Sequence, residues 1–301
     1  MKTEVVFWFW GQRIPGGPRT ILEPLGIGPD AVVIDEATVQ RVHHVSVTIT
    51  MPENDARLPD LRALLTQHGV DWSESRHDRY TADELDNARL LWLSPTSDCE
   101  VDGGSEFGTM YDLSAACPRC GAGARQTSPL FFDGNEDQVS KLKGHRAGRT
   151  YRDEVFIDEL LAVEIDALAP KGLLLHQVYA LQPDKRQAKI LWKQLSAERI
   201  LPPMSPLTTG IDRPYPCPIC PRSGYWDGVP TPRIVYRARD LEDAGDVNIT
   251  WEEKYEGVIM GNPREWRVPT PWLLVTPKVM RVFRAAGITE FEWVPIRVVD
   301  E

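Results

Sequence analysis

Two Cys-Pro-x-Cys motifs, far apart in the sequence, constrain the fold of this 301-residue chain more than any other feature. The first is Cys117-Pro-Arg-Cys120 and the second is Cys217-Pro-Ile-Cys220. Zn²⁺ prefers four tetrahedral ligands, and two residues between paired cysteines let both sulfur atoms point at one ion from a tight turn. We therefore predict that Cys117, Cys120, Cys217 and Cys220 bind one structural zinc ion.

The distance between the motifs along the chain decides what kind of zinc fold is possible. Cys120 and Cys217 are separated by 96 residues, far more than a compact zinc ribbon contains. Closing a loop of this length costs about 4–5 kcal/mol of chain entropy, whereas structural zinc contributes about 10–16 kcal/mol in small peptides. The metal contribution is the larger, so we predict a long-range pair of zinc knuckles with four cysteine ligands and an inserted α/β segment, residues 122–216, between them.

The residues that follow each motif bear on the alternatives to zinc. Gly121 follows the first motif at a place where a knuckle tolerates a positive φ, which frees backbone N–H groups to hydrogen-bond sulfur. Pro221 takes that place after the second motif, so this turn must close differently, with Gly224 nearby. A redox Cys-Pro-x-Cys site starts a helix, and neither motif is followed by a helix start. Redox chemistry and unpaired thiols stay open as alternatives.

Other ligand types are available in the chain. His145 and His176 fall between the motifs and could replace a thiolate ligand, although a loop histidine and a strand histidine are the simpler interpretations. Cys99 lacks a partner in the sequence and is interpreted as a buried or loop thiol.

The chain contains none of the common short catalytic motifs. GxSxG, GxxxxGK[ST], GxGxxG and HExxH are all absent from the sequence. Four thiolates also fill the zinc shell and leave no position for a reactive water. We predict no catalytic residue and no organic cofactor, while an active site built from residues scattered along the chain would escape this search.

The net charge of −10 bears on partners. An acidic chain disfavours a broad nucleic-acid surface and suits a basic protein partner, while ordinary solubility is the simpler explanation of the charge. The apolar run Val5 to Trp10 is too short for a signal peptide core or a membrane span. We therefore expect a cytoplasmic protein with no membrane partner, whose cysteines stay reduced.

Two segments are rich in charged residues of one sign, one basic and one acidic. Residues 141–152 carry five basic residues and no acid, which supports nucleic-acid association as the alternative function if the segment is more than a solvated loop. Residues 240–256 are rich in acids around Trp251 and Tyr255, and could bind a basic protein if they are more than an exposed strand or loop edge.

Hydrophobic periodicity predicts an α+β fold, because strands and helices mix without a βαβ rhythm. We predict an N-terminal α+β region, residues 1–108, and a zinc-stapled α+β domain, residues 109–301. The expected strands are 5–10, 31–34, 42–50, 90–93, 173–181, 189–195, 234–236, 273–276 and 290–299. The expected helices are 58–68, 81 to about 87, 155–167 with Phe156, Leu160, Val163 and Leu168 on its apolar side, and the segment between Thr276 and Gly287.

The motifs and their surroundings resemble the bacterial double-CXXCG motif proteins. The similar stretch begins near Tyr111-Asp112-Leu113 and runs through the first motif; it continues with Leu201-Pro-Pro ahead of the second motif and ends with Val279 to Val294. It covers roughly the C-terminal 190 residues. The family includes immunity proteins paired with secreted antibacterial toxins, so the resemblance implies a non-catalytic binder that neutralises a cognate toxin.

Overall fold

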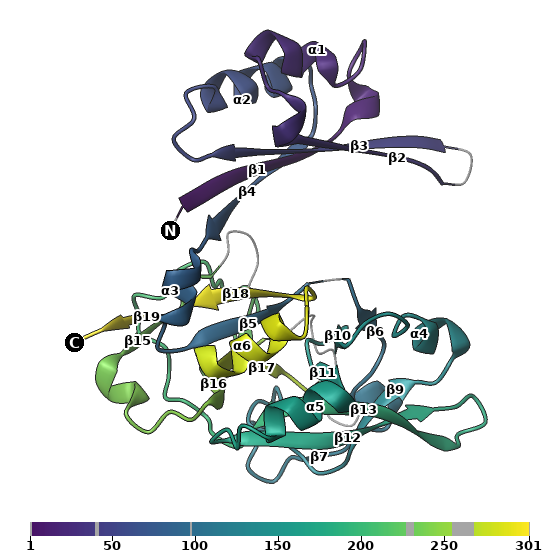
Figure 1. Ribbon diagram of the computed structural model, residues 1–301, viewed down its shortest axis with the longest axis vertical. Helices are drawn as coiled ribbons and strands as arrows, with labels where there is room; N and C mark the ends of the chain where they lie inside the picture. Colours follow the sequence, from purple (N-terminus) through teal and green to yellow (C-terminus); the bar gives the residue numbers. More distant parts are fainter. Residues whose placement is uncertain (1, 40–41, 97, 227–231, 255–267, 301) are drawn as a thin grey trace. The chain divides into compact units, whose positions relative to one another are not determined.

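The computed structural model describes residues 2–39, 42–96, 98–226, 232–254 and 268–300. The fold is mixed α+β, as predicted, and it consists mostly of strands with a few helices. The chain divides between Thr81 and Ala82 into two compact units (Figure 1). The predicted boundary after residue 108 differs from this division. The reason is that β5 (Leu91–Pro95) pairs with β17 (Thr270–Val275) inside the second unit.

The first unit is a four-stranded antiparallel sheet with two helices on one face (Figure 1). Its strand order is β2-β3-β1-β4. The strands are β1 (Lys2–Trp10), β2 (Val32–Val39), β3 (Val42–Pro52) and β4 (Trp72–Arg79), and the helices are α1 (Arg19–Leu22) and α2 (Leu58–Gln67). The sequence did not predict β4, because its polar run WSESRHDR gives no apolar alternation.

Side chains alternate along β1 and so create the core of this unit. Val5, Phe7 and Phe9 are buried on one face, while Trp8 between them is exposed. The helix predicted at 58–68 is confirmed as α2, and its buried stripe packs on the same core. That stripe consists of Leu58, Leu61 and Leu65.

The described residues of the second unit form two larger sheets and two small ones. The six-stranded sheet has the order β6 (Glu100–Val101), β10 (Ala147–Thr150), β11 (Val155–Asp158), β13 (Gln187–Ala197), β12 (Leu173–Leu181) and β9 (Leu130–Asp133). The five-stranded sheet has the order β14 (Ser223–Tyr225), β16 (Val247–Lys254), β17, β5 and β18 (Phe291–Pro295). A parallel bridge between Ile200 and Ile249 connects the chain leaving β13 to β16.

The remaining elements are short. β7 (Tyr111–Asp112) pairs with β8 (Arg125–Gln126), and β15 (Val235–Arg237) pairs with β19 (Arg297–Val299). The helices of this unit are α3 (Ala82–Asp86), α4 (Glu136–Ser140), α5 (Glu159–Asp166) and α6 (Pro277–Ala285). In the described part of the chain, no helix has the length and apolar character needed to cross a bilayer.

Local signals predicted several of these elements well. The hairpin of β12 and β13 and the helix α6 are confirmed, with Pro277 at the first helical position and Gly287 just past the end at a φ of 72°. The final strand, predicted as one piece over 290–299, is two strands in different sheets, because β18 pairs with β5 and β19 pairs with β15.

The helix predicted over 155–167 is wrong at its start and on its apolar side. Residues 155–158 form β11, which pairs with β10 and β13 on either side. Asp158 then caps α5 by accepting a hydrogen bond from the Leu161 backbone N–H at 2.6 Å. The later start turns Leu160 and Val163 outward, 70% and 64% exposed. The buried face of α5 is instead Leu161, Ala162 and Ile165.

Candidate metal centre

The four cysteines lie in two turns of the second unit. Cys117 and Cys120 lie in the turn between β7 and β8, and Cys217 and Cys220 lie just before β14. Their four sulfur atoms are all within 4.8 Å of one another. The structure therefore brings together the four residues that the sequence selected.

The sulfur separations fit a tetrahedral thiolate site. The Sγ atoms of Cys117 and Cys217 are 3.8 Å apart, and those of Cys120 and Cys220 are 3.5 Å apart. Four ligands placed tetrahedrally about 2.3 Å from one zinc ion lie about 3.8 Å from each other. A disulfide would need about 2.05 Å. The geometry is thus compatible with one metal ion such as zinc.

The first turn closes on itself through its backbone. The Gly121 N–H donates to the Cys117 carbonyl at 2.8 Å, and the Cys117 N–H donates to the Ala122 carbonyl at 2.8 Å. Gly121 has a φ of 73°, the positive value predicted for it. A backbone hydrogen bond from Ala122 reaches the Cys120 thiol. Such N–H···S contacts orient the sulfur and favour its thiolate form.

The second turn has Pro221 in the place of Gly121, and other contacts stabilise it, as predicted. Backbone hydrogen bonds from Ile219 and Cys220 reach the Cys217 thiol. The Arg213 guanidinium donates to the carbonyls of Cys220 at 2.8 Å and Ser223 at 3.0 Å. It also lies 5.2 Å from the centre of the Tyr225 ring.

The thiols have different acidities. Burial raises the pKa of Cys217, but the backbone hydrogen bonds of Ile219 and Cys220 and the thiols of Cys120 and Cys117 outweigh it and lower that pKa to about 7. Burial raises the pKa of Cys120 and of Cys220. A bound metal needs all four groups as thiolates, so metal uptake at this site would release protons.

Glu253 on β16 connects the two turns, a role that the sequence did not predict. Both of its carboxylate oxygens accept from the Gly123 N–H at 3.1 Å, beside the first turn. One of them also pairs with the Arg222 guanidinium at 2.8 Å, beside the second turn. Burial raises the pKa of Glu253 to about 7, against the lowering effect of Arg222 and the Gly123 N–H.

The two histidines considered as substitute ligands lie elsewhere. His145 Nδ1 is 2.8 Å from Oε1 of Glu290, and His176 lies on β12. Cys99 is 1% exposed, and burial raises its pKa to about 12, with a smaller contribution from Glu290. A thiol in this state is a poor metal ligand and a weak nucleophile.

The basic segment 141–152 is largely neutralised by ion pairs. Arg146 pairs at 2.8 Å, Arg152 pairs at 3.0 Å, and Arg149 pairs with two acids. The partners are Asp158 and Glu164 for Arg146, Glu106 for Arg152, and Glu100 and Asp153 for Arg149.

The acidic segment 240–256 is in part a buried strand, which corrects its interpretation as an exposed edge. Glu252 and Glu253 on β16 are 5% and 4% exposed. Oε1 of Glu252 accepts from the Met204 N–H at 2.8 Å. Tyr255 and Glu256 lie outside the described residues.

Comparison with protein-family models gives no match for this chain, and comparison with curated proteins gives none either.

Proposed function

We propose that Cys117, Cys120, Cys217 and Cys220 bind one zinc ion whose role is structural, and that their turns form a pair of zinc knuckles. Residues 122–216 are then a segment inserted between the knuckles, containing β8 to β13. The observation that carries this proposal is the cluster of four Sγ atoms within 4.8 Å, with pair separations near the tetrahedral value. Four thiolates would fill the coordination shell of the zinc ion, so the ion would cross-link the two turns and would have no open position for a substrate.

The metal content of purified protein tests this proposal. Protein prepared without chelator should contain one zinc per chain by elemental analysis, and Co²⁺ in its place should give the absorption of a tetrahedral thiolate complex. Cys99→Ser protein is the matched control and should keep one zinc. Metal-free wild-type protein with an unchanged fold would contradict the proposal.

We further propose that the chain is a cytoplasmic protein-binding module that neutralises a cognate antibacterial toxin. Two observations support this. The net charge of −10 suits a basic partner, and the two motifs with their surroundings resemble the double-CXXCG family. This function needs no catalytic residue, and binding would act by blocking the toxin.

Co-purification tests the binding function. The chain should form a stable 1:1 complex with the product of a neighbouring gene and should protect cells that express this product. An acidic protein that recognises a basic partner should bind more slowly as salt rises, because screening weakens long-range attraction. If the products of all adjacent genes fail to bind at low salt, the proposal is refuted.

The alternative is association with nucleic acid through residues 141–152. Its support is the sequence pattern of five basic residues, of which Lys141 and Lys143 have no ion pair among the described residues. The ion pairs of the three arginines weigh against it, since a paired guanidinium must lose its acid before it can bind a phosphate. A gel-shift assay at low salt separates the two functions, because only the alternative predicts a shifted band.

A further inference from the structure

A cavity of about 530 Å³ lies in the second unit, beside the two cysteine turns. Its walls come from the six-stranded sheet, at β12 and β13, and from the five-stranded sheet, at β16 and β17. Gly123 and Arg222, which flank the two turns, complete it. Its volume lies in the range of pockets that hold small organic molecules. The cavity is separate from the sulfur cluster, because none of the four cysteines lines it.

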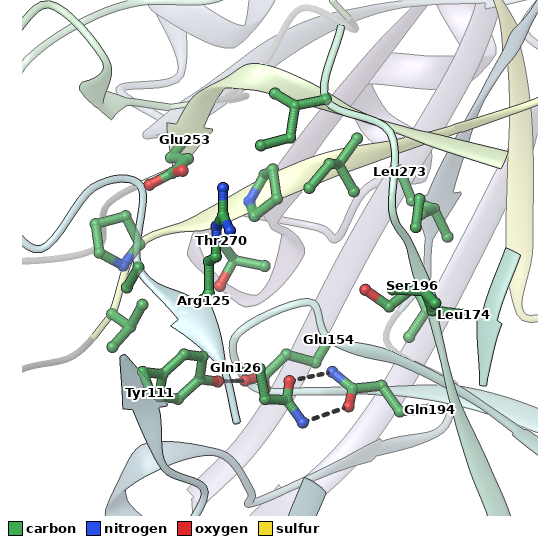
Figure 2. A pocket seen from close by; sticks show the side chains of 18 of the residues that line it. Tyr111, Arg125, Gln126, Glu154, Leu174, Gln194, Ser196, Glu253, Thr270 and Leu273 are labelled. Carbon is green, nitrogen blue, oxygen red and sulfur yellow. Dashed lines mark hydrogen bonds between the residues drawn. The ribbon is translucent and has the colours of Figure 1, made fainter. Parts of the chain in front are cut away.

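Cross-strand pairs form one wall of the cavity. Leu174 lies opposite Ser196, and His176 lies opposite Gln194, in the antiparallel pairing of β12 and β13. All four therefore project from the same face of the sheet. Gln194 is held by a reciprocal pair of hydrogen bonds with Gln126, at 2.8 and 2.9 Å (Figure 2). Apolar side chains line the cavity as well, among them Leu273, Ile249 and Ile200.

The buried acids that line the cavity already have partners within the protein. Glu154 accepts from the Tyr111 hydroxyl at 3.0 Å (Figure 2). It also accepts from the Thr150 hydroxyl. Glu253 is held by Arg222 and the Gly123 N–H. A third acid of the lining, Asp153, is half-buried and pairs with Arg149 and Lys254. Glu198, the remaining acid of the lining, is exposed to solvent.

Several polar groups of the lining contact no partner within the described ranges of the chain. In the described part of the chain, the guanidinium of Arg125, an exposed residue of β8, makes no hydrogen bond and no ion pair, and Figure 2 shows it near Thr270 at the cavity. Asp112, opposite it on β7, attracts it only over a longer distance. The hydroxyls of Thr270 and Ser196 and the His176 imidazole likewise have no hydrogen bond among the described residues. Burial lowers the pKa of His176 and so favours the neutral ring, which can donate one hydrogen bond and accept another.

We propose that this cavity binds a small organic carboxylate with an apolar body, whose carboxylate pairs with Arg125. One unpaired cation matches one negative charge, and the nearby Glu253 and Glu198 disfavour a second charge such as that of a phosphate dianion. Thr270 and Ser196 offer hydroxyl donors to the ligand, and Leu174 and Leu273 offer apolar contact. This proposal does not depend on toxin binding.

Two fluorescent probes that differ by a single anionic group test it. Anilinonaphthalene sulfonate is a monoanion with an apolar body, and N-phenyl-1-naphthylamine is the same molecule without the sulfonate. Arg125→Gln should weaken sulfonate probe binding about tenfold and leave the neutral probe unchanged, because only the charge-assisted contact is lost. Arg284→Gln, an exposed arginine of α6 that does not line the cavity, is the matched control and should change neither.

A second variant locates the probes in the cavity. Ser196→Phe places a ring in the space between the sheets and should weaken both probes, with the fold checked by circular dichroism. In competition, 1-naphthoate should displace the sulfonate probe at lower concentration than 1-naphthyl phosphate. Absence of probe binding, an equal effect of Arg125→Gln on both probes, insensitivity to Ser196→Phe, or stronger displacement by the phosphate would each overturn the proposal.

Discussion

Replacing Gly224 by alanine should disrupt the second cysteine turn far more than an ordinary glycine substitution would. Gly224 has a φ of 99°, and a Cβ built on it would lie 2.0 Å from the Tyr215 carbonyl oxygen and 3.0 Å from Pro216 Cα. Both contacts are backbone, so no side chain can move aside. The clash therefore pushes on the segment that leads directly into Cys217.

Gly144 offers a matched control for the magnitude. Its φ is 85°, and a Cβ there would meet nothing within 4 Å. Alanine at either position incurs about 1–3 kcal/mol of backbone strain. At Gly224 the backbone must also move by about 1 Å to reach an allowed contact, and absorbing such a shift as a bond-angle distortion of about 15° costs about 4 kcal/mol. We expect an excess of about 2–4 kcal/mol for Gly224→Ala over Gly144→Ala.

Competition for zinc with a chromophoric chelator measures this excess destabilisation as a difference in zinc affinity between the two variants. If the strain is expressed in the metal site, Gly224→Ala should bind zinc about 30-fold to 700-fold more weakly than Gly144→Ala. Melting temperatures should fall in the same order. Equal zinc affinities in the two variants would refute the reasoning, because the control carries the positive φ without the backbone clash.

Three further predictions concern single side chains. Cys117→Ser and Cys217→Ser should each yield insoluble protein, with Cys99→Ser as soluble as wild type; wild-type solubility and zinc content in the first two would contradict a structural site. Burial raises the pKa of Glu253 from 4.5 to about 7, so its contribution to stability is greatest below pH 4.5 and is lost as the pH rises through 7. Wild type should therefore lose up to about 3 kcal/mol relative to Glu253→Gln between pH 5 and pH 8, and a pH-independent difference in melting temperature would argue against this. Native Cys99, with a pKa near 12, should resist a thiol reagent at pH 8 and react in denaturant; rapid modification of zinc-loaded native protein at Cys99, located by peptide mapping, would disagree.

Local patterns predicted those elements whose own residues decide their conformation. The helix α6 has an extended residue, Thr276, followed by Pro277 at its start and Gly287 after its end, and each acts within one turn. The same patterns failed where pairing with distant strands mattered. The apolar pattern of residues 155–158 fits a helix as well as it fits a strand. These residues form a strand because they pair with β10 on one side and β13 on the other.

Charged residues were the least predictable from the sequence. The basic run 141–152 indicates a cationic surface, yet its three arginines pair with acids from as far away as Glu100 and Glu106. The acidic run around Trp251 indicates an exposed edge, yet Glu253 is buried between the two cysteine turns. Net charge is a property of composition, whereas burial and pairing depend on which strands become neighbours.

Short stretches of sequence suffice for the α+β class and for the choice of the four cysteines, because alternation along strands and two-residue spacing within each motif are local properties. The approach of Cys117 and Cys217 to 3.8 Å, across 100 positions of sequence, arises only in the folded unit. The same is true of Arg125, which faces a cavity without a partner among the described residues. Such contacts depend on strand order and register, which emerge from the packing of the whole unit and leave no mark in any one segment of the chain.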